Sequence, residues 1–240
     1  MSLPNERLNV RQVAGIVLCG GKSSRMGTSK AWLPFGVELM LPRVVRILLE
    51  VVDPVVVVAA KDQSLPPLPM NAYLVHDERE AQGPLEGLRR GLEALAARNK
   101  LSRGGPVIPA AAAFATSCDV PLLRPEFVRR MVEELGDASI AVPVDGQFHH
   151  PLAAVYRLEV LPHIEALLNA DRHRPVYLFD EAPTKHVPVE QLRDVDPQLE
   201  SLRNLNHLED YKQAVADYVA AARRRISVED TSARNSDSGT

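Results

Sequence analysis

The alternation of apolar and polar positions predicts strands and helices that follow one another along the chain. Short apolar runs, rich in β-branched residues or alanine, are typical of buried parallel strands. They cover residues 13–19, 55–60, 73–75, 112–117 and 138–143. Residues 41–52 have the apolar spacing of an amphipathic helix, and helices over 84–98 and 125–135 begin with a proline, which suits a first turn. Strands alternating with helices predict βαβ units with right-handed crossovers.

The pattern changes after residue 143. Asp145-Gly146 is a hairpin-type turn. It precedes a strand over 152–156, a helix over 158–168, a short helix from 171–175, an edge strand over 185–189 and a final helix over 207–224. We therefore expect an α/β fold, a Rossmann-like three-layer α/β/α sandwich with a mostly parallel central sheet.

The domain organisation follows from the same pattern. We expect a flexible N-terminus over residues 1–12 and one domain over 13–224. Within the domain, the change of pattern after residue 143 separates a first half over residues 13–143 from a second half over residues 144–224. The tail over 225–240 has almost no apolar content, so we expect it to be disordered.

Composition narrows the class of protein. The 240 residues contain 45% hydrophobic and 25% charged residues, as in a soluble globular protein. The net charge of −3 argues against nucleic acid as the main partner. No apolar stretch is long enough for a membrane span or signal peptide, so we expect no membrane association and a cytoplasmic location. Cys19 and Cys118 each end a predicted strand, and we expect buried free thiols.

A glycine pair directly follows the first predicted strand. Gly20 and Gly21 allow close approach of the backbone to a ligand, and Lys22, Arg25 and Lys30 add positive charge. Backbone amides and cations after a first strand favour phosphate binding. The Walker pattern fails because Ile16 stands at its first glycine, and the Rossmann pattern fails because the two glycines are adjacent. The alternative is an ordinary βα turn with surface cations.

Two aspartates end later strands. Asp119 follows the run 112–117, and ligands of open parallel sheets bind beyond the carboxyl ends of the strands. A carboxylate at this place can hold Mg²⁺, which bridges phosphate oxygens. The alternative for Asp119 is a helix cap or turn. Asp77 ends the third strand and precedes Gly83-Pro84, and its alternative is a loop aspartate before a helix.

The string LCGGKSSRMGTSK resembles L-A-G-G-x-S-x-R-M-G-x-D-K, the signature loop of the MobA-like nucleotidyltransferases. The segments D…GPLEG and CDVP also resemble this family, in the family's order. The resemblance implies catalytic roles for Arg25, Lys30 and Asp119, and Mg²⁺ bound by Asp119. It also implies a set of nucleotide-binding residues: Leu18, Cys19, Gly20, Gly21, Arg25, Lys30, Asp77, Gly83, Pro84 and Asp119.

The sequence departs from the family at two places. Ser29 replaces the aspartate before Lys30, which removes an expected charge partner of the lysine. Ala60 stands at the end of a strand where several members have asparagine against the base or ribose, so base selection must depend on backbone groups.

The resemblance also implies that residues 13–143 form a nucleotide-binding half and residues 144–224 an acceptor-binding half. The resemblance implies acceptor-binding roles for His150, Arg174, Asn204 and Asn206, whereas the alternatives are a packed histidine and an asparagine N-cap. Within the superfamily the chain looks most like molybdenum cofactor guanylyltransferases. The implied reaction is transfer of GMP from GTP to molybdenum-molybdopterin, with cofactor biosynthesis or acceptor proteins as further partners. CTP, a sugar-phosphate acceptor, or nucleotide binding without catalysis are the alternatives.

Overall fold

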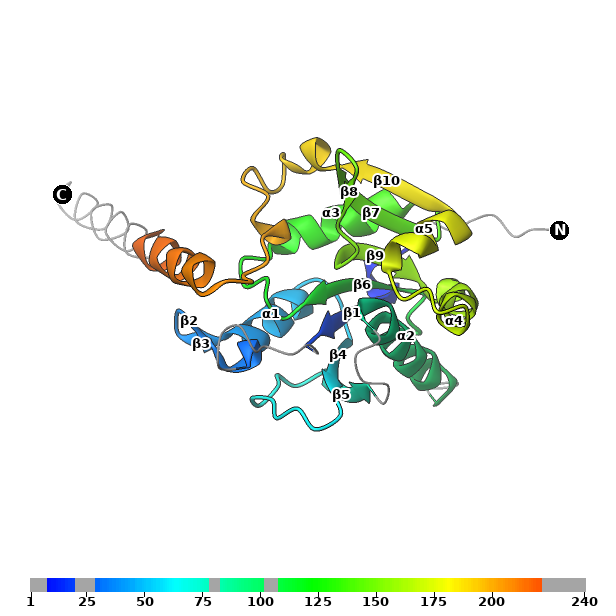
Figure 1. Cartoon of the computed structure of the whole chain (residues 1–240), viewed down its shortest axis with the longest axis horizontal. Coiled ribbons are helices and arrows are strands. Elements are labelled where there is room, and N and C mark those ends of the chain that lie inside the picture. Colours follow the sequence, from blue (N-terminus) through cyan, green and yellow to red (C-terminus); the bar gives the residue numbers. More distant parts are fainter. Residues whose placement is uncertain (1–7, 20–28, 78–82, 102–107, 222–240) are drawn as a thin grey trace, which may run out of the picture.

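The structure, a computed structural model, describes residues 8–19, 29–77, 83–101 and 108–221. Gly20, Gly21, Lys22 and Arg25 lie outside the described residues, as does the tail over 225–240. A single large sheet crosses the molecule in the order β10-β7-β9-β6-β1-β4-β5, and β8 pairs with β7 (Figure 1). Its strands are β1 (Val13–Leu18), β4 (Val55–Ala60), β5 (Ala72–Asp77), β6 (Ala112–Ser117), β7 (Ile140–Asp145), β8 (Phe148–His149), β9 (Ala153–Arg157) and β10 (Thr184–Pro188).

Helices cover both faces of this sheet. They are α1 (Met40–Leu49), α2 (Pro84–Leu101), α3 (Pro125–Leu135), α4 (Leu161–Asn169) and α5 (Leu178–Glu181). A further helix covers residues 208–221. Val13 and Val17 of β1 share a core with α1 and α3. Ile16 and Leu18 pack on the opposite face with α2, α4 and α5. Alternate side chains of one strand thus enter two cores, which confirms the three-layer α/β/α sandwich.

Most strands are parallel, as expected. β1 pairs in parallel with β4 and β6, β4 with β5, and β7 with β10. β9 runs antiparallel to both β6 and β7, so these two strands point the same way. The carboxyl ends of β1, β4, β5, β6 and β7 therefore meet at one edge, where ligands of such sheets bind.

The predicted elements are close to the observed ones. The ranges 55–60, 112–117 and 125–135 match β4, β6 and α3. The strand predicted over 73–75 is longer, since β5 pairs with β4 from Ala72 to Asp77. The edge strand is confirmed as β10, and the predicted hairpin joins β7 to the unpredicted β8.

Other boundaries were wrong by a few residues. α1 ends at Leu49, because the amide of Glu50 donates to Ile47 in a tighter turn. The strand predicted over 138–143 starts later and extends into the hairpin as β7. The helix predicted over 158–168 begins as a 3₁₀ turn, Leu158–Val160, before α4. The helix expected from 171 begins as a 3₁₀ turn at Pro175.

Regular structure also occurs outside the predicted elements. Val10–Gln12 forms a 3₁₀ turn capped by Asn9, within the stretch that we expected to be flexible. Two short strands, β2 (Pro34–Phe35) and β3 (Glu38–Leu39), form a separate ribbon around Gly36. None of the helices that the structure describes is long and apolar enough to cross a membrane.

The helix over 208–221 packs against the β2–β3 ribbon and α1, away from the main sheet (Figure 1). A small core joins them, formed by Phe35, Met40, Leu205 and Ala214. The guanidinium of Arg43 contacts two neighbouring rings, 5.2 Å from the centroid of Phe35 and 4.5 Å from that of Tyr218. This contact brings the C-terminal helix back to the N-terminal part of the fold.

Candidate functional site

The ends of β1 and β6 lie side by side at the carboxyl edge. The amide of Cys19 donates to Val58 at 2.8 Å, and the amide of Cys118 donates to Leu18 at 3.0 Å. Both cysteines are buried and free, which confirms the expected thiols. A hydrogen bond with Cys19 and burial raise the pKa of the Cys118 thiol well above its ordinary value. The neutral thiol is therefore the form present at pH 7, and it is a poor nucleophile.

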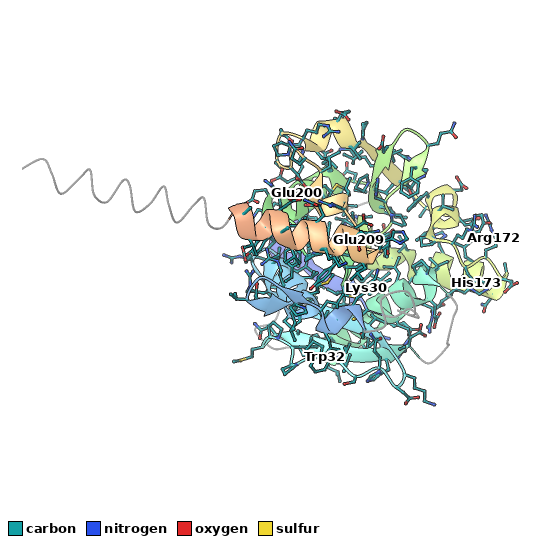
Figure 2. The ribbon with its side chains drawn as sticks, turned by 60° about the vertical axis from the view of Figure 1, so that its left-hand side comes forward. Lys30, Trp32, Arg172, His173, Glu200 and Glu209 are labelled. Atoms are coloured by element: carbon teal, nitrogen blue, oxygen red, sulfur yellow. The ribbon has the colours of Figure 1, made fainter. Side chains whose placement is uncertain are left out.

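Lys30, Asp119 and Asn206 meet at this edge. The ammonium of Lys30 donates to Oδ2 of Asp119 at 2.7 Å and to Oδ1 of Asn206 at 2.8 Å. Ser117 donates to the other carboxylate oxygen, Oδ1 of Asp119. In Figure 2, Lys30 lies between the N-terminal elements and the C-terminal helix. The expectation that Ser29 leaves Lys30 without a charge partner was wrong, because Asp119 fills that role.

Asp119 belongs to a turn that is fixed from two sides. Its carbonyl accepts the amide of Leu205 at 2.9 Å. Two residues further, the carbonyl of Pro121 accepts Nε of Arg43 at 2.7 Å. The N-cap position of α3 is Arg124, so Asp119 does not cap that helix. Its carboxylate instead binds Lys30 and Ser117.

The segment that carries Asn206 is positioned by a buried aspartate. Asp196 is fully buried and accepts the amides of Glu200 at 3.0 Å and Ser201 at 2.8 Å. Arg124 lies 3.3 Å from Oδ1 of Asp196, and its amide donates to Ser201 at 3.0 Å. These bonds join the chain before residue 204 to the start of α3. Asn206 can therefore reach Lys30 from a fixed turn.

Asp77, Gly83 and Pro84 lie further along the same edge. Asp77 ends β5 opposite Ala60, and Pro84 begins α2. Gly83 has a positive φ of 79°, and a Cβ there would lie 3.5 Å from the carbonyl of His173. A positive φ is strained for other residues, so the turn before α2 favours glycine. Residues 78–82 lie outside the described residues.

α2 packs closely on β1 because two of its residues are glycines. A Cβ on Gly87 would lie 3.1 Å from a methyl of Leu18, and one on Gly91 would lie 2.7 Å from a methyl of Ile16. The last glycine of the GPLEG segment therefore has a packing role at Leu18. The nucleotide-binding assignment of Leu18 stays a prediction.

The other predicted acceptor residues are not joined to this cluster. Within the described ranges, no hydrogen bond or ion pair links His150, Arg174 or the side chain of Asn204 to Lys30 or Asp119. Arg174 and Asn204 are exposed. The ring of His150 packs edge-on against Phe148, with centroids 5.0 Å apart, and burial lowers its pKa. His150 is therefore mostly neutral at pH 7, and the acceptor roles stay predictions.

Three residues important for this geometry were not found from the sequence. Arg43 and Asp196 resemble any helix arginine or loop aspartate in the sequence, and only the fold brings them to the site. Gln63 gave a weak signal, as a polar residue three positions after a strand end. Its side chain contacts Cys19, Ser29 and Ala60.

The chemistry of the donors at this edge fits magnesium better than a transition metal. Among the residues that the structure describes, no group of three or more His, Cys, Asp or Glu side chains could hold a metal ion. Asp119 offers carboxylate oxygens, of which Oδ2 now binds Lys30. Mg²⁺ is typically bound by one or two carboxylates together with substrate phosphates and water. A single aspartate is therefore a suitable protein ligand for Mg²⁺ that arrives with a nucleotide.

The sequence of this chain is similar to those of known nucleotidyltransferases. Residues 15–186 match the model of the MobA-like NTP transferase domain. A probable molybdenum cofactor guanylyltransferase of Mycolicibacterium paratuberculosis is 35% identical over 186 residues, covering 76% of this chain and 88% of that protein. One with the same name from Methanosarcina acetivorans is 30% identical over 220 residues, covering 86% and 91%.

Solved structures share the fold at lower identity. Molybdopterin-guanine dinucleotide biosynthesis protein A of Archaeoglobus fulgidus has a TM-score of 0.68 and 18% identity, covering 86% of this chain and 99% of that one. The 2-C-methyl-D-erythritol 4-phosphate cytidylyltransferase of Thermus thermophilus has a TM-score of 0.59 and 15% identity, covering 84% and 97%. The domain match and the identity to relatives over most of their length show that this chain belongs to the MobA-like NTP transferase family and is a nucleotidyltransferase.

Proposed function

We propose that this protein transfers GMP from GTP to the terminal phosphate of molybdenum-bound molybdopterin. A phosphate oxygen of the acceptor forms a bond to the α-phosphorus of GTP. The bond between this phosphorus and the oxygen that bridges to the β-phosphate breaks, and pyrophosphate leaves. The products are the guanine dinucleotide form of the cofactor and pyrophosphate. Relatives with 30–35% identity are named probable molybdenum cofactor guanylyltransferases, which supports this choice of substrates.

The contact that carries the proposal is Lys30 between Asp119 and Asn206. It joins a phosphate-binding lysine, a metal-binding carboxylate and the acceptor-side asparagine within 2.7–2.8 Å of one ammonium group. Nucleotide and acceptor phosphates both carry negative charge, so bringing them together requires cations and hydrogen-bond donors. Lys30 supplies a cation at the place where the two halves of the domain meet.

The protein's part in the reaction is alignment and charge neutralisation. Asp119 would hold Mg²⁺, and the ion would supply positive charge that offsets the charge of the phosphates. Lys30 would bind the triphosphate, and Arg25 would add a second cation. Asn206 would orient Lys30 or the acceptor. None of these roles needs a protein nucleophile, which fits the raised pKa of the Cys118 thiol.

A cytidylyltransferase is the second candidate. Ala60 stands at the end of β4, where several family members have a base-contacting asparagine, so the sequence does not favour guanine there. A non-catalytic binding protein is less well supported, because Lys30 retains a charge partner despite Ser29.

Pyrophosphate release from each of the four NTPs tests the proposal. The assay contains Mg²⁺ and is run with and without molybdenum-molybdopterin. Release with GTP only, and only with the acceptor, is the expected result. Release with CTP instead would replace guanylyl by cytidylyl transfer. Absence of release with all four would contradict the proposal, and a sugar-phosphate panel would then identify another acceptor.

A further inference from the structure

One glutamine side chain joins the two residues that border the phosphate-binding segment. Nε2 of Gln63 donates to the carbonyl of Cys19 at 2.9 Å, and it lies 3.5 Å from Oγ of Ser29 and 3.7 Å from Sγ of Cys19. Cys19 is the last described residue before the gap at 20–28, and Ser29 is the first described residue after it. The amide of Gln63 therefore links both borders of the glycine-rich stretch.

The glutamine is itself held by the end of β4. Its backbone amide donates to the carbonyl of Ala60 at 3.1 Å, which closes a four-residue turn. Its Oε1 accepts the amide of Ala60, also at 3.1 Å. The side chain is half-buried, and both ends of its carboxamide are engaged. Gln63 is therefore suited to fixing the backbone around it, and it has little free capacity to read a base.

The same hydrogen-bond chain continues along the carboxyl edge. A ring nitrogen of His76, Nδ1, lies 3.1 Å from the carbonyl of Ala60. The carbonyl of His76 accepts Nε of Arg90 at 3.3 Å, and Arg90 belongs to α2. This series of hydrogen bonds thus runs from the end of β1 through Gln63 and the end of β4 to the helix that begins with Pro84. It spans the strands whose ends bear the predicted nucleotide-binding residues.

Gln63 contacts the two residues at which the sequence departs from the family pattern. Ser29 stands where the family has aspartate, and Ala60 stands where several members have asparagine. Neither side chain can make the polar contacts of the residue it replaces. Gln63 contacts both positions, through Oγ of Ser29 and the amide of Ala60.

We propose that Gln63 is a positioning residue for the nucleotide: it fixes Cys19 and Ser29 relative to the end of β4 and so sets the approach of the triphosphate. This inference rests on the proposed nucleotidyl transfer and adds a residue to its nucleotide half. It predicts that Gln63 affects nucleotide binding far more than acceptor binding, because its contacts are with residues 19, 29 and 60.

Two substitutions separate hydrogen bonding from charge. Gln63→Met keeps the size of the side chain and removes all its hydrogen bonds, whereas Gln63→Glu keeps the acceptor for Ala60 and loses the donors to Cys19 and Ser29. Gln198→Glu, at an exposed glutamine before Leu199, is the matched control for the added charge. Dissociation constants for Mg²⁺–GTP are measured by calorimetry, and KM for the acceptor is measured at saturating GTP.

We expect both Gln63 variants to raise the dissociation constant for GTP about tenfold. The acceptor KM should stay within about twofold of wild type, a split that general unfolding would not produce. Gln198→Glu should change neither value. Unchanged GTP binding in Gln63→Met would overturn the inference, and so would a loss confined to Gln63→Glu, since that would indicate charge repulsion.

The binding measurement also separates this inference from the proposed function. If wild type binds GTP but releases no pyrophosphate with molybdenum-molybdopterin, the proposed reaction fails, while the GTP affinities of the Gln63 variants still test the positioning role. If wild type turns over and the variants bind GTP normally, the reaction stands and the role of Gln63 is rejected.

Discussion

The ammonium of Lys30 lies 2.7 Å from Oδ2 of Asp119, although 89 residues separate the two in the chain. Both side chains are largely shielded from water, with 16% and 13% of their surface exposed. The pair neutralises the carboxylate before any ligand arrives. Under the proposed function, a nucleotide phosphate and Mg²⁺ would therefore compete with this ion pair for Lys30 and Asp119.

Asp119→Ala should abolish turnover and leave most nucleotide binding intact. The variant loses the carboxylate proposed to hold Mg²⁺, while Lys30 remains free to bind phosphate. Pyrophosphate release and GTP calorimetry measure the two effects separately. Asp210→Ala, at an exposed aspartate of the C-terminal helix, should behave as wild type. Full activity of Asp119→Ala would remove this residue from the mechanism.

Lys30→Met should lower kcat/KM by about 10²–10³-fold, because a charged donor near the reacting phosphates is lost. It should also lower the free energy of unfolding by about 1–3 kcal/mol, since Asp119 keeps its charge in a shielded place without the ammonium. Lys212→Met is the control, because that lysine is exposed and forms an ion pair with its helix neighbour Glu209. Equal activity of the two variants would contradict the role of Lys30.

Arg43→Lys should destabilise the fold more than Arg46→Lys, although both arginines lie on α1 and bind Glu38. Arg43 also binds the carbonyl of Pro121 and packs against two aromatic rings, contacts that lysine cannot reproduce together. We expect a loss of about 2–3 kcal/mol for Arg43→Lys. Arg46 is 45% exposed, so its replacement should cost less than about 1 kcal/mol. Urea unfolding of both variants measures the difference, and equal losses would contradict the prediction.

Gly91→Ala should lower the stability of the protein by about 1–3 kcal/mol through overpacking. The new Cβ would lie 2.7 Å from Cγ2 of Ile16, a β-branched side chain with little freedom to move. At Gly87 the nearest atom is a terminal methyl of Leu18 at 3.1 Å, which can shift more easily. The gain in helix propensity of about 1 kcal/mol should then nearly offset the strain in Gly87→Ala. Thermal unfolding compares the two variants, and a larger loss at Gly87 would contradict this packing.

The stability of wild type should fall as the pH is lowered from 7.5 to 5.5. Burial lowers the pKa of His150, so the folded protein resists a proton that the unfolded chain binds near about pH 6.5. The stabilisation is present above that value and is lost as the pH falls through the folded pKa. His150→Gln should reduce the fall, and so should His149→Gln, whose histidine has a pKa lowered by burial. Chemical unfolding at several pH values checks this, and parallel curves for wild type and His150→Gln would contradict it.

The sequence predicted the sheet well because buried parallel strands are continuous apolar runs. Val55–Ala60 is apolar throughout, and Ala112–Ser117 is apolar up to Thr116. β8 was missed because two residues give no periodicity, and their pairing depends on the hairpin. The division of the predicted helix into a 3₁₀ turn, Leu158–Val160, and α4 was also missed, since apolar spacing does not distinguish a 3₁₀ turn from an α-helix.

The site was predictable where chemistry follows a strand end. Asp119 was singled out this way, whereas Lys30 and Asn206 were singled out by the family resemblance. The structure brings the three side chains together, and their roles stay predictions. The partners of Lys30 could not be deduced, because they come from segments 89 and 176 residues away. Arg43, Gln63 and Asp196 act through backbone atoms of other segments, and the sequence does not record such contacts.

Asn206 is synthesised long after Lys30, and this order affects how the newly made protein folds. Lys30 leaves the ribosome 176 residues before Asn206. At a synthesis rate of about 5–20 residues per second, this interval lasts about 9–35 s. During it, β1, β4 and β5 can already assemble, since they need no later strand to pair with one another. The nascent chain can thus pair these three strands first, and the hydrogen bond between Lys30 and Asn206 forms only after the segment before the helix over 208–221 has been made.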